Sequence, residues 1–459
     1  MRHLVILCLL AVAGCGGNDD RAVDSSRTAP RDAVQRFHSA PALKPPAVTV
    51  RKRSPGMAPG YVFLAPRKGA GQQGPMIVDD RGDLVWFRSV PGEESASDFR
   101  VQTYRGQPVL TYWQGRFAGG GGNGEYVILD SSYREVARVR SVGDHGDLHE
   151  FELTPEGTAL FFVYRTERDI VDCVIQEVDV ATGRLRFQWS ARDHVPLRDS
   201  YKEREPGKAW DYIHLNSIDV EDNGNLLVSA RNTHAIYEID RRTGRILWTL
   251  GGKASDFRMA RGAQFAWAHD ANRQPDGTIT IFDNGAAPKV REQSRGLVLA
   301  VKGRRVTVRR AYTHRPRLLT HISADMQRLP NGNVFIGWGA TSYFSEQAPS
   351  GRLLFDARFT DTENDTYRAY RFPWTGRPGG APKLAAAGAT VYASWNGATE
   401  VRGWRVLAGP SPDALAPAGT AARRGFETAI TVRGDEPFVA VEAIGAGGEV
   451  LGRSRAIRR

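Results

Sequence analysis

The sequence predicts an all-β protein: a six-bladed β-propeller followed by a small C-terminal β-sandwich of the fibronectin or immunoglobulin type. Short runs of β-branched and aromatic residues alternate with polar residues, and Asp-Gly, Asn-Gly and Thr-Gly turns separate these runs. Long stretches of helical periodicity are missing. Similar strand–turn–strand units recur along the chain, which is typical of a repeat fold.

The repeated units share a tight turn that ends in a glycine, at Gly157, Gly224, Gly277 and Gly332. Their spacing of roughly 50 to 70 residues is near the size of a four-stranded blade with inserted loops. Spread over residues 58–372, a period of roughly 50 favours six blades and leaves five or seven open.

The two ends of the chain differ from its middle. Residues 1–14 hold an apolar run too short to span a bilayer, ending before Cys15 in the small-residue pattern of a lipoprotein cleavage site. We expect removal of this signal peptide and acylation of Cys15, although an ordinary signal peptide with a chance cysteine is the alternative. Residues 15–40 are too polar to fold alone and predict a disordered tether.

The remaining sequence divides into a propeller over 41–374 and a sandwich over 380–459, separated by a Gly- and Pro-rich stretch. Together with the signal peptide, this predicts an exported protein that a lipid anchor holds to the outer face of the cell membrane.

The net charge of +11 is scattered along the chain, without a basic helix or a long Lys/Arg run. Nucleic acid is therefore not an expected partner, whereas anionic lipids or small anionic substrates fit the charge, as does a plain solvated surface. Beyond the tether only Cys173 remains, so no disulfide framework forms. Its apolar strand favours core packing over a role as nucleophile.

Polar residues recur eight positions before the turn glycines, where the innermost strand of a blade would begin. The occupants are His149, Asn216 and His269, and the fourth position holds Ala324. His214 precedes Asn216 by two residues, so both point to the same side of an extended strand.

Equivalent positions in a closed ring of blades converge on one axis. These residues, joined by Arg231 at the end of the next strand, should form an anion-binding cup at one mouth of the channel. His145 and His321 lie nearby in register but are offset. Imidazoles also bind zinc, but no carboxylate or thiolate stands at equivalent positions and Arg231 would repel a cation, so neither a metal nor another cofactor is expected.

Three segments, 147–158, 210–231 and 265–285, resemble the active-site motifs of the bacterial arylsulfotransferases, and the resemblance runs from about Phe37 to about Trp374. It implies a six-bladed propeller that moves a sulfuryl group between phenols without the nucleotide sulfate donor. His269 matches the nucleophile of the family. The groups around the sulfuryl oxygens are matched by His149, His214, Asn216 and Arg231.

The chemistry is consistent with these residues. A neutral imidazole can attack the sulfur of an aryl sulfate, because the departing phenol is a tolerable leaving group. We expect a sulfohistidine on His269, stabilisation of the sulfuryl oxygens by Arg231, His214 and Asn216, and proton exchange with both phenols at His149. Aryl sulfate and phenol are then the partners, and the kinetics are ping-pong.

Two other functions are compatible with the fold. A non-catalytic propeller lipoprotein could serve as a binding or envelope-assembly scaffold, but it needs no converging histidines. A propeller hydrolase or quinone-dependent dehydrogenase would want clustered acidic metal ligands, and the calcium-like loop at 219–224 lacks its closing glutamate because Ala230 stands there. The sequence carries no signal for the natural donor and acceptor, the role of the sandwich or the oligomeric state.

Overall fold

The computed structural model describes residues 32–459, so the predicted signal peptide and Cys15 lie outside the described residues. This part of the chain contains 37 strands and two short 3-10 helices, η1 (Ala191–Asp193) and η2 (Leu197–Asp199). The predicted all-β class is confirmed. Within the same range, none of the helices is long and apolar enough to cross a membrane.

The first three large sheets follow the chain order closely, because tight turns join neighbouring strands. The first combines β2 (Tyr61–Leu64), β4 (Met76–Val78) and β5 (Leu84–Phe87) with β29 (Tyr370–Phe372). The second contains β6 (Ser95–Tyr104), β7 (Gln107–Ala118), β8 (Gly121–Leu129) and β9 (Glu135–Val139). The third contains β10 (Phe151–Leu153), β11 (Thr158–Glu167), β12 (Ile170–Asp179) and β13 (Leu185–Ser190), with β14 (Trp210–Asp211) parallel to β12.

Three further sheets repeat this antiparallel pattern. The fourth contains β15 (Leu215–Val220), β16 (Leu226–Ala230), β17 (Ala235–Ile239) and β18 (Ile246–Gly251). The fifth contains β20 (His269–Arg273), β21 (Ile279–Asp283), β22 (Arg295–Lys302) and β23 (Arg305–Tyr312), with β19 (Arg258–Met259) at its edge. The sixth contains β24 (Asp325–Arg328), β25 (Val334–Gly337), β26 (Tyr343–Gln347), β27 (Leu353–Phe359) and β1 (Val48–Arg53).

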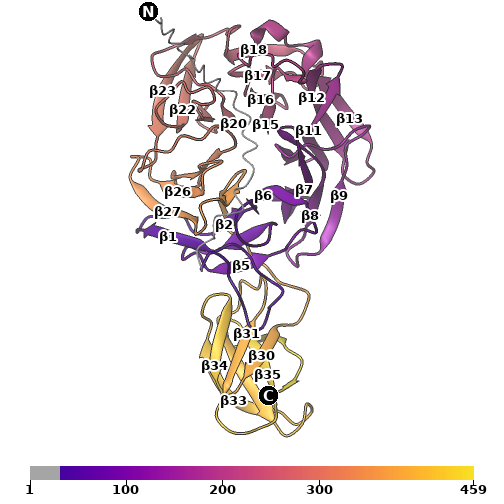
Figure 1. Ribbon diagram of the computed structural model, residues 1–459, viewed down its shortest axis with the longest axis vertical. Coiled ribbons are helices and arrows are strands. Elements are labelled where there is room, and N and C mark those ends of the chain that lie inside the picture. The colour runs from indigo at the N-terminus through magenta and orange to yellow at the C-terminus, as the bar shows by residue number, and fades with distance from the viewer. Residues whose placement is uncertain (1–31) are drawn as a thin grey trace, which may run out of the picture.

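Figure 1 shows these six sheets around a common centre, with β6, β15 and β20 on the inner side. Inner strands of successive sheets contact each other: β6 contacts β10, β15 contacts β20, and β20 contacts β24. The late strand β29 contacts both β25 and β6. A small pair, β3 (Pro66–Arg67) with β28 (Asp365–Thr366), also joins the beginning of this region to its end.

Buried apolar side chains fill the spaces between neighbouring sheets. One cluster combines Phe162 of β11, Ile175 of β12 and Val228 of β16, which belong to the third and fourth sheets. Cys173 is fully buried in this cluster, which confirms core packing for that residue. The packing of sheet against sheet fixes where each inner strand begins.

The C-terminal segment forms two smaller sheets below the ring in Figure 1. One contains β30 (Lys383–Ala387), β31 (Thr390–Ser394) and β34 (Glu427–Thr431). The other contains β33 (Ala416–Ala422), β32 (Gly403–Gly409), β35 (Phe438–Ile444), β36 (Val450–Arg453) and β37 (Ile457–Arg458). Both sheets contribute to one buried cluster, with Val391 and Ile430 from the first and Trp404 and Val441 from the second. The fibronectin-type assignment stays a prediction.

The predicted tether ends earlier than residue 40. Glu427 of β34 accepts hydrogen bonds from the backbone N–H groups of His38 (3.0 Å) and Ser39 (2.6 Å). The Phe37 ring packs on Phe426 at a centroid distance of 4.4 Å, and Ala33 is only 1 % exposed. Residues 33–39 are therefore part of the folded protein, because Glu427 and Phe426 hold this segment from the C-terminal region.

Candidate active site

His149 lies just before β10, and Asp147 holds it in place. The Asp147 Oδ1 atom accepts the backbone N–H of His149 at 3.0 Å and lies 2.5 Å from its Nδ1. The other carboxylate oxygen accepts the N–H of Gly122 at 2.8 Å. With an acceptor beside Nδ1, the Nδ1 atom carries the proton and Nε2 is left for the site.

His214 is held in the same way, three residues after its partner. Its Nδ1 lies 2.5 Å from Oδ2 of Asp211, at the end of β14. The backbone of His214 has φ of +55°, an unusual conformation for a residue with a side chain, and one of the kind found at functional sites. The rings of His149 and His214 meet edge to face, with 4.8 Å between their centroids.

His269 begins β20 and is 1 % exposed. Its Nδ1 lies 2.8 Å from Oδ1 of Asn284, and both N–H bonds of that amide go to the carbonyls of Thr320 and Ser323, which fixes Oδ1 as the acceptor. The Nε2 atom receives a long hydrogen bond of 3.3 Å from the N–H of Ser323. The proton therefore sits on Nδ1 and the lone pair on Nε2.

Arg231 follows β16 and faces the same region. Its guanidinium stands over the Trp267 ring, 5.1 Å from the ring centroid, and donates to the carbonyl of His321 at 3.0 Å. Its Nε is buried and lacks a hydrogen-bond partner among residues 32–459. Burial lowers the pKa of Arg231 to about 10, so the side chain remains a cation near neutral pH.

Asn216 is completely buried, and its amide connects two sheets. Its Nδ2 donates to the carbonyl of Ala268 at 2.8 Å, and its Oδ1 accepts the hydroxyl of Ser229. Asn216 thus holds Ala268, the residue before His269, in place. Its Nδ2 atom also has a second N–H that can donate.

Burial and positive charge act together on the histidines. Burial, followed by the charge of Arg231, lowers the pKa of His269 well below its usual 6.5. Burial also lowers the pKa of His214, against the opposing effect of Asp211. His269 is therefore a neutral imidazole near pH 7, as a nitrogen nucleophile must be.

Several residues of this site escaped the sequence analysis. Asp147, Asp211 and Asn284 orient the three rings, so carboxylates do accompany the histidines, contrary to the reasoning used against a metal. The sequence could have pointed to Asp147 and Asp211 only through their positions, two and three residues before the histidines that they orient. Within residues 32–459, no cluster of three or more His, Cys, Asp or Glu side chains has the geometry to hold a metal ion.

Tyr164 and Tyr367 frame the rings. The Tyr164 ring stacks on His149 at 5.5 Å, and the Tyr367 ring meets His149 edge to face at 5.3 Å and His269 at 6.5 Å. Of the two offset histidines, His145 is exposed and His321 contributes its carbonyl to Arg231.

A cavity of 990 Å³ lies at the opposite ends of the inner strands. Its lining includes Pro155 and Gly224 in the turns after β10 and β15, whereas His149 and Asn216 lie at the starts of those strands. Arg100 and Glu152 also line it. The predicted site residues therefore gather at one end of the ring, and this cavity opens at the other.

The described geometry is that of an all-β protein with a buried site of three oriented histidines and one arginine. The chain belongs to the arylsulfotransferase family, whose family model, described as Arylsulfotransferase (ASST), matches residues 100–360, more than half of the sequence. This confirms the resemblance seen in the motifs, and at the level of the family it supports an enzyme with aryl sulfotransferase activity.

No curated protein matches this chain significantly. Solved structures similar to it include a protein of unknown function from Bacteroides caccae, with 14 % identity, coverage of 68 % of this chain and 98 % of that chain, and a TM-score of 0.41. TolB from Acinetobacter baumannii has 12 % identity, coverage of 69 % and 68 %, and a TM-score of 0.41. Virginiamycin B lyase from Staphylococcus aureus has 10 % identity, coverage of 75 % and 95 %, and a TM-score of 0.35.

Proposed function

We propose that this protein transfers a sulfuryl group from an aryl sulfate to a phenol, without a nucleotide sulfate donor, through a sulfohistidine on His269. The observation that carries the proposal is the state of His269: its Nδ1–H is fixed by Asn284, and burial beside Arg231 keeps the ring neutral. Nε2 then holds a lone pair that can attack sulfur.

In the first half-reaction, the Nε2 lone pair of His269 forms a bond to sulfur while the bond between sulfur and the aryl oxygen breaks. The leaving phenolate takes a proton from Nε2 of His149. His149 must then start as an imidazolium, which the Asp147 carboxylate at 2.5 Å stabilises. His149 ends this step as a neutral ring with its proton on Nδ1.

In the second half-reaction, an incoming phenol gives its proton to Nε2 of His149 as its oxygen attacks the sulfur. The bond between His269 and sulfur breaks, and the lone pair returns to Nε2. Both histidines return to their starting protonation states, so the cycle balances without a metal or other cofactor. Because the first phenol leaves before the second phenol reacts, the kinetics are ping-pong.

The negative sulfuryl oxygens need donors that are already in position. Arg231 supplies a cation whose Nε is buried and has no hydrogen-bond partner among residues 32–459. Neutral His214 keeps its proton on Nδ1 towards Asp211, so it would donate to a sulfuryl oxygen only after its Nε2 takes up a proton. The N–H of Ser323 contacts Nε2 of His269 in this structure and would pass to a sulfuryl oxygen once Nε2 is bonded to sulfur. Asn216 can add its second amide hydrogen.

The architecture and the cellular place of the protein are part of the same proposal. The six successive sheets, whose inner strands contact each other and return from β29 to β6, support a closed six-bladed propeller. Anchoring through an acylated Cys15, export to the outer face of the cell membrane and a fibronectin-type C-terminal domain rest on the sequence pattern.

The test is intact-protein mass spectrometry after mixing the purified protein with p-nitrophenyl sulfate, for the wild type and for His269→Ala. We expect the wild type alone to gain the mass of one SO₃ group, and its release of p-nitrophenol to accelerate when phenol is added. If neither protein gains mass or releases p-nitrophenol across a range of aryl sulfates, the binding-propeller alternative replaces the enzyme.

A further inference from the structure

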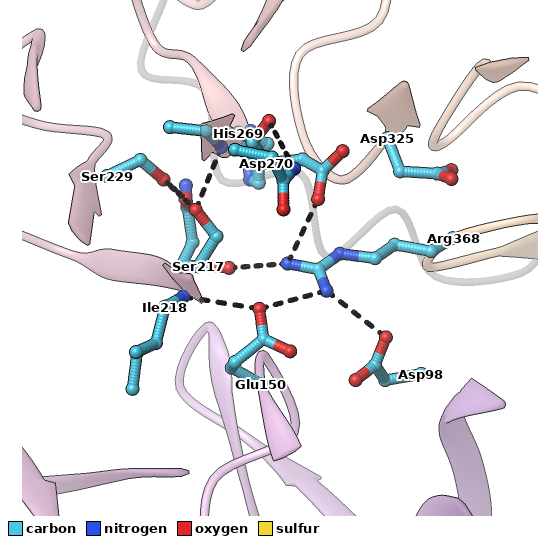
Figure 2. A network of polar contacts seen from close by, with 12 residues as sticks. Asp98, Glu150, Ser217, Ile218, Ser229, His269, Asp270, Asp325 and Arg368 are labelled. Atoms are coloured by element: carbon cyan, nitrogen blue, oxygen red, sulfur yellow. Dashed lines mark hydrogen bonds and ion pairs between the residues drawn. The ribbon is translucent and has the colours of Figure 1, made fainter. Parts of the chain in front are cut away.

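Arg368 occupies the centre of the ring, beneath the histidines. Its side chain is fully buried and extends between Asp98, Glu150 and Asp270, as Figure 2 shows. The Nη1 atom lies 3.2 Å from Asp98 Oδ1 and 3.1 Å from Glu150 Oε2. The Nη2 atom donates to the carbonyl of Asn216 at 2.8 Å. This one side chain therefore contacts residues from three different sheets.

The contacts of Arg368 lead directly to the histidines. The Asn216 carbonyl that it binds also accepts the hydroxyl of Tyr367 at 3.2 Å. The guanidinium lies 5.1 Å from the centroid of the Tyr367 ring. That ring in turn contacts both His149 and His269. Arg368 thus supports an aromatic ring that contacts both histidines.

The strand of His269 is held from the same centre. Asp270 has φ of +60°, and its Oδ2 accepts the N–H of Met326 at 2.8 Å. Its Oδ1 lies 3.9 Å from Nη2 of Arg368. Asp98, which also binds Arg368, has φ of +50°. These left-handed residues sit at irregularities of the inner strands β6 and β20, which direct both carboxylates towards the guanidinium.

Stability alone is a weak explanation for this arrangement. Removing ions from water costs free energy, and a protein in which well-packed apolar groups replace a buried ion pair is often as stable as the original. A planar guanidinium can bind carboxylates and a carbonyl at fixed angles, which an ammonium or an apolar side chain cannot do. The geometry is thus better suited to fixing positions than to adding stability.

We propose that Arg368 is a positioning residue of the histidine site: it fixes the Asn216 backbone and the Tyr367 ring and thereby sets the placement of His149 against His269. The consequence for catalysis rests on the proposed function, whereas the placement of the rings does not. Tyr367 contacts the histidines through its ring, while its hydroxyl donates to the carbonyl of Asn216.

The experiment compares Arg368→Lys with Arg371→Lys in the full-length protein. Arg371 is also buried, lies on the adjacent strand β29, and binds Glu346 at 3.0 Å with its guanidinium over Phe355. Both substitutions keep the charge and disturb a buried ion pair, but only the first touches the histidine site.

Two readouts separate positioning from stability. In ¹⁵N-histidine NMR spectra, we expect Arg368→Lys to shift the His149 and His269 ring signals, and Arg371→Lys to leave them in place. With p-nitrophenyl sulfate, we expect Arg368→Lys to lower kcat at least tenfold with KM changed less than threefold, at a loss of Tm similar to that of Arg371→Lys.

Equal effects of the two lysine variants on the ring signals would overturn the proposal. The NMR result decides the positioning role even if the wild type fails to release p-nitrophenol, a result that would overturn only the proposed function. Altered ring signals with an unchanged kcat in an active protein would leave the positioning of the rings in place and would overturn its consequence for catalysis.

Discussion

His269 and His314 are both buried, and yet their surroundings give them opposite chemistry. His314 packs at the edge of Trp338, and its two nitrogens face two acceptors: Asp356 Oδ1 at 2.9 Å and the carbonyl of Pro316 at 3.0 Å. His269 faces one acceptor, Asn284, and one donor, the N–H of Ser323. Acceptors therefore face both nitrogens of His314, whereas the lone pair on Nε2 of His269 faces a donor.

The difference shows that burial alone does not decide what a buried histidine can do chemically. The kind of partner on each ring nitrogen decides whether a lone pair is available. In both His149 and His214 a carboxylate faces Nδ1, and Nε2 has no hydrogen-bond partner within residues 32–459.

The largest expected effect separates these two histidines. Changing His269→Asn should reduce p-nitrophenol release by about 1,000-fold or more, because the nucleophile is lost. Changing His314→Asn should lower the free energy of unfolding by about 3 kcal/mol, because Asp356 loses a buried partner, and should leave kcat within about twofold. Urea unfolding and initial rates measure both. Similar losses of kcat in the two variants would erase the distinction.

A smaller effect is expected at the carboxylate that orients His149. Asp147→Asn should lower kcat by about 100-fold, because an amide stabilises the His149 imidazolium less well than a carboxylate. Aryl sulfates with better leaving groups need less protonation and should lose less activity. Steady-state rates over a series of substituted phenyl sulfates measure this. If kcat falls by the same factor for every substrate in the series, Asp147 supports the fold and does not assist protonation of the leaving group.

The smallest effect concerns pH. The pKa of His269 lies well below 6.5, so its lone pair should persist as the pH falls through 6.5, and the acid limb of kcat/KM should lie below that value. In the unfolded chain the His269 ring takes up a proton near pH 6.5, whereas in the folded protein it stays neutral at that pH. The contribution of His269 to the free energy of unfolding should therefore decrease as the pH falls through 6.5. Rate profiles and urea unfolding from about pH 8 to 5 test both, and an acid limb at 6.5 or above contradicts the first.

The repeat pattern explains why much of the site could be predicted. Residues at the starts of inner strands meet at one end of the ring, so His149, His214 and His269 could be grouped although they are distant in sequence. The orienting partners could not be predicted in this way. Asn284 reaches His269 only because β21 returns antiparallel to β20.

Tyr367 and Arg368 follow no repeat position, because they lie between β28 and β29 in the segment that crosses back to the first sheet. The early end of the predicted tether was missed for a related reason. The carboxylate that binds His38 belongs to Glu427, 389 positions further along the chain. Local composition carries no sign of so distant a partner.

The pairing of β2 with β29 has a consequence for the order in which the protein can be made. Tyr61 pairs with Phe372, and Val48 of β1 pairs with Phe359 of β27. A chain that emerges from its N-terminus must therefore keep these early strands unpaired until most of it has been synthesised. Such distant partners slow folding, since a long loop must close before the contacts form. The first sheet, although first in sequence, is the last of the six to be completed.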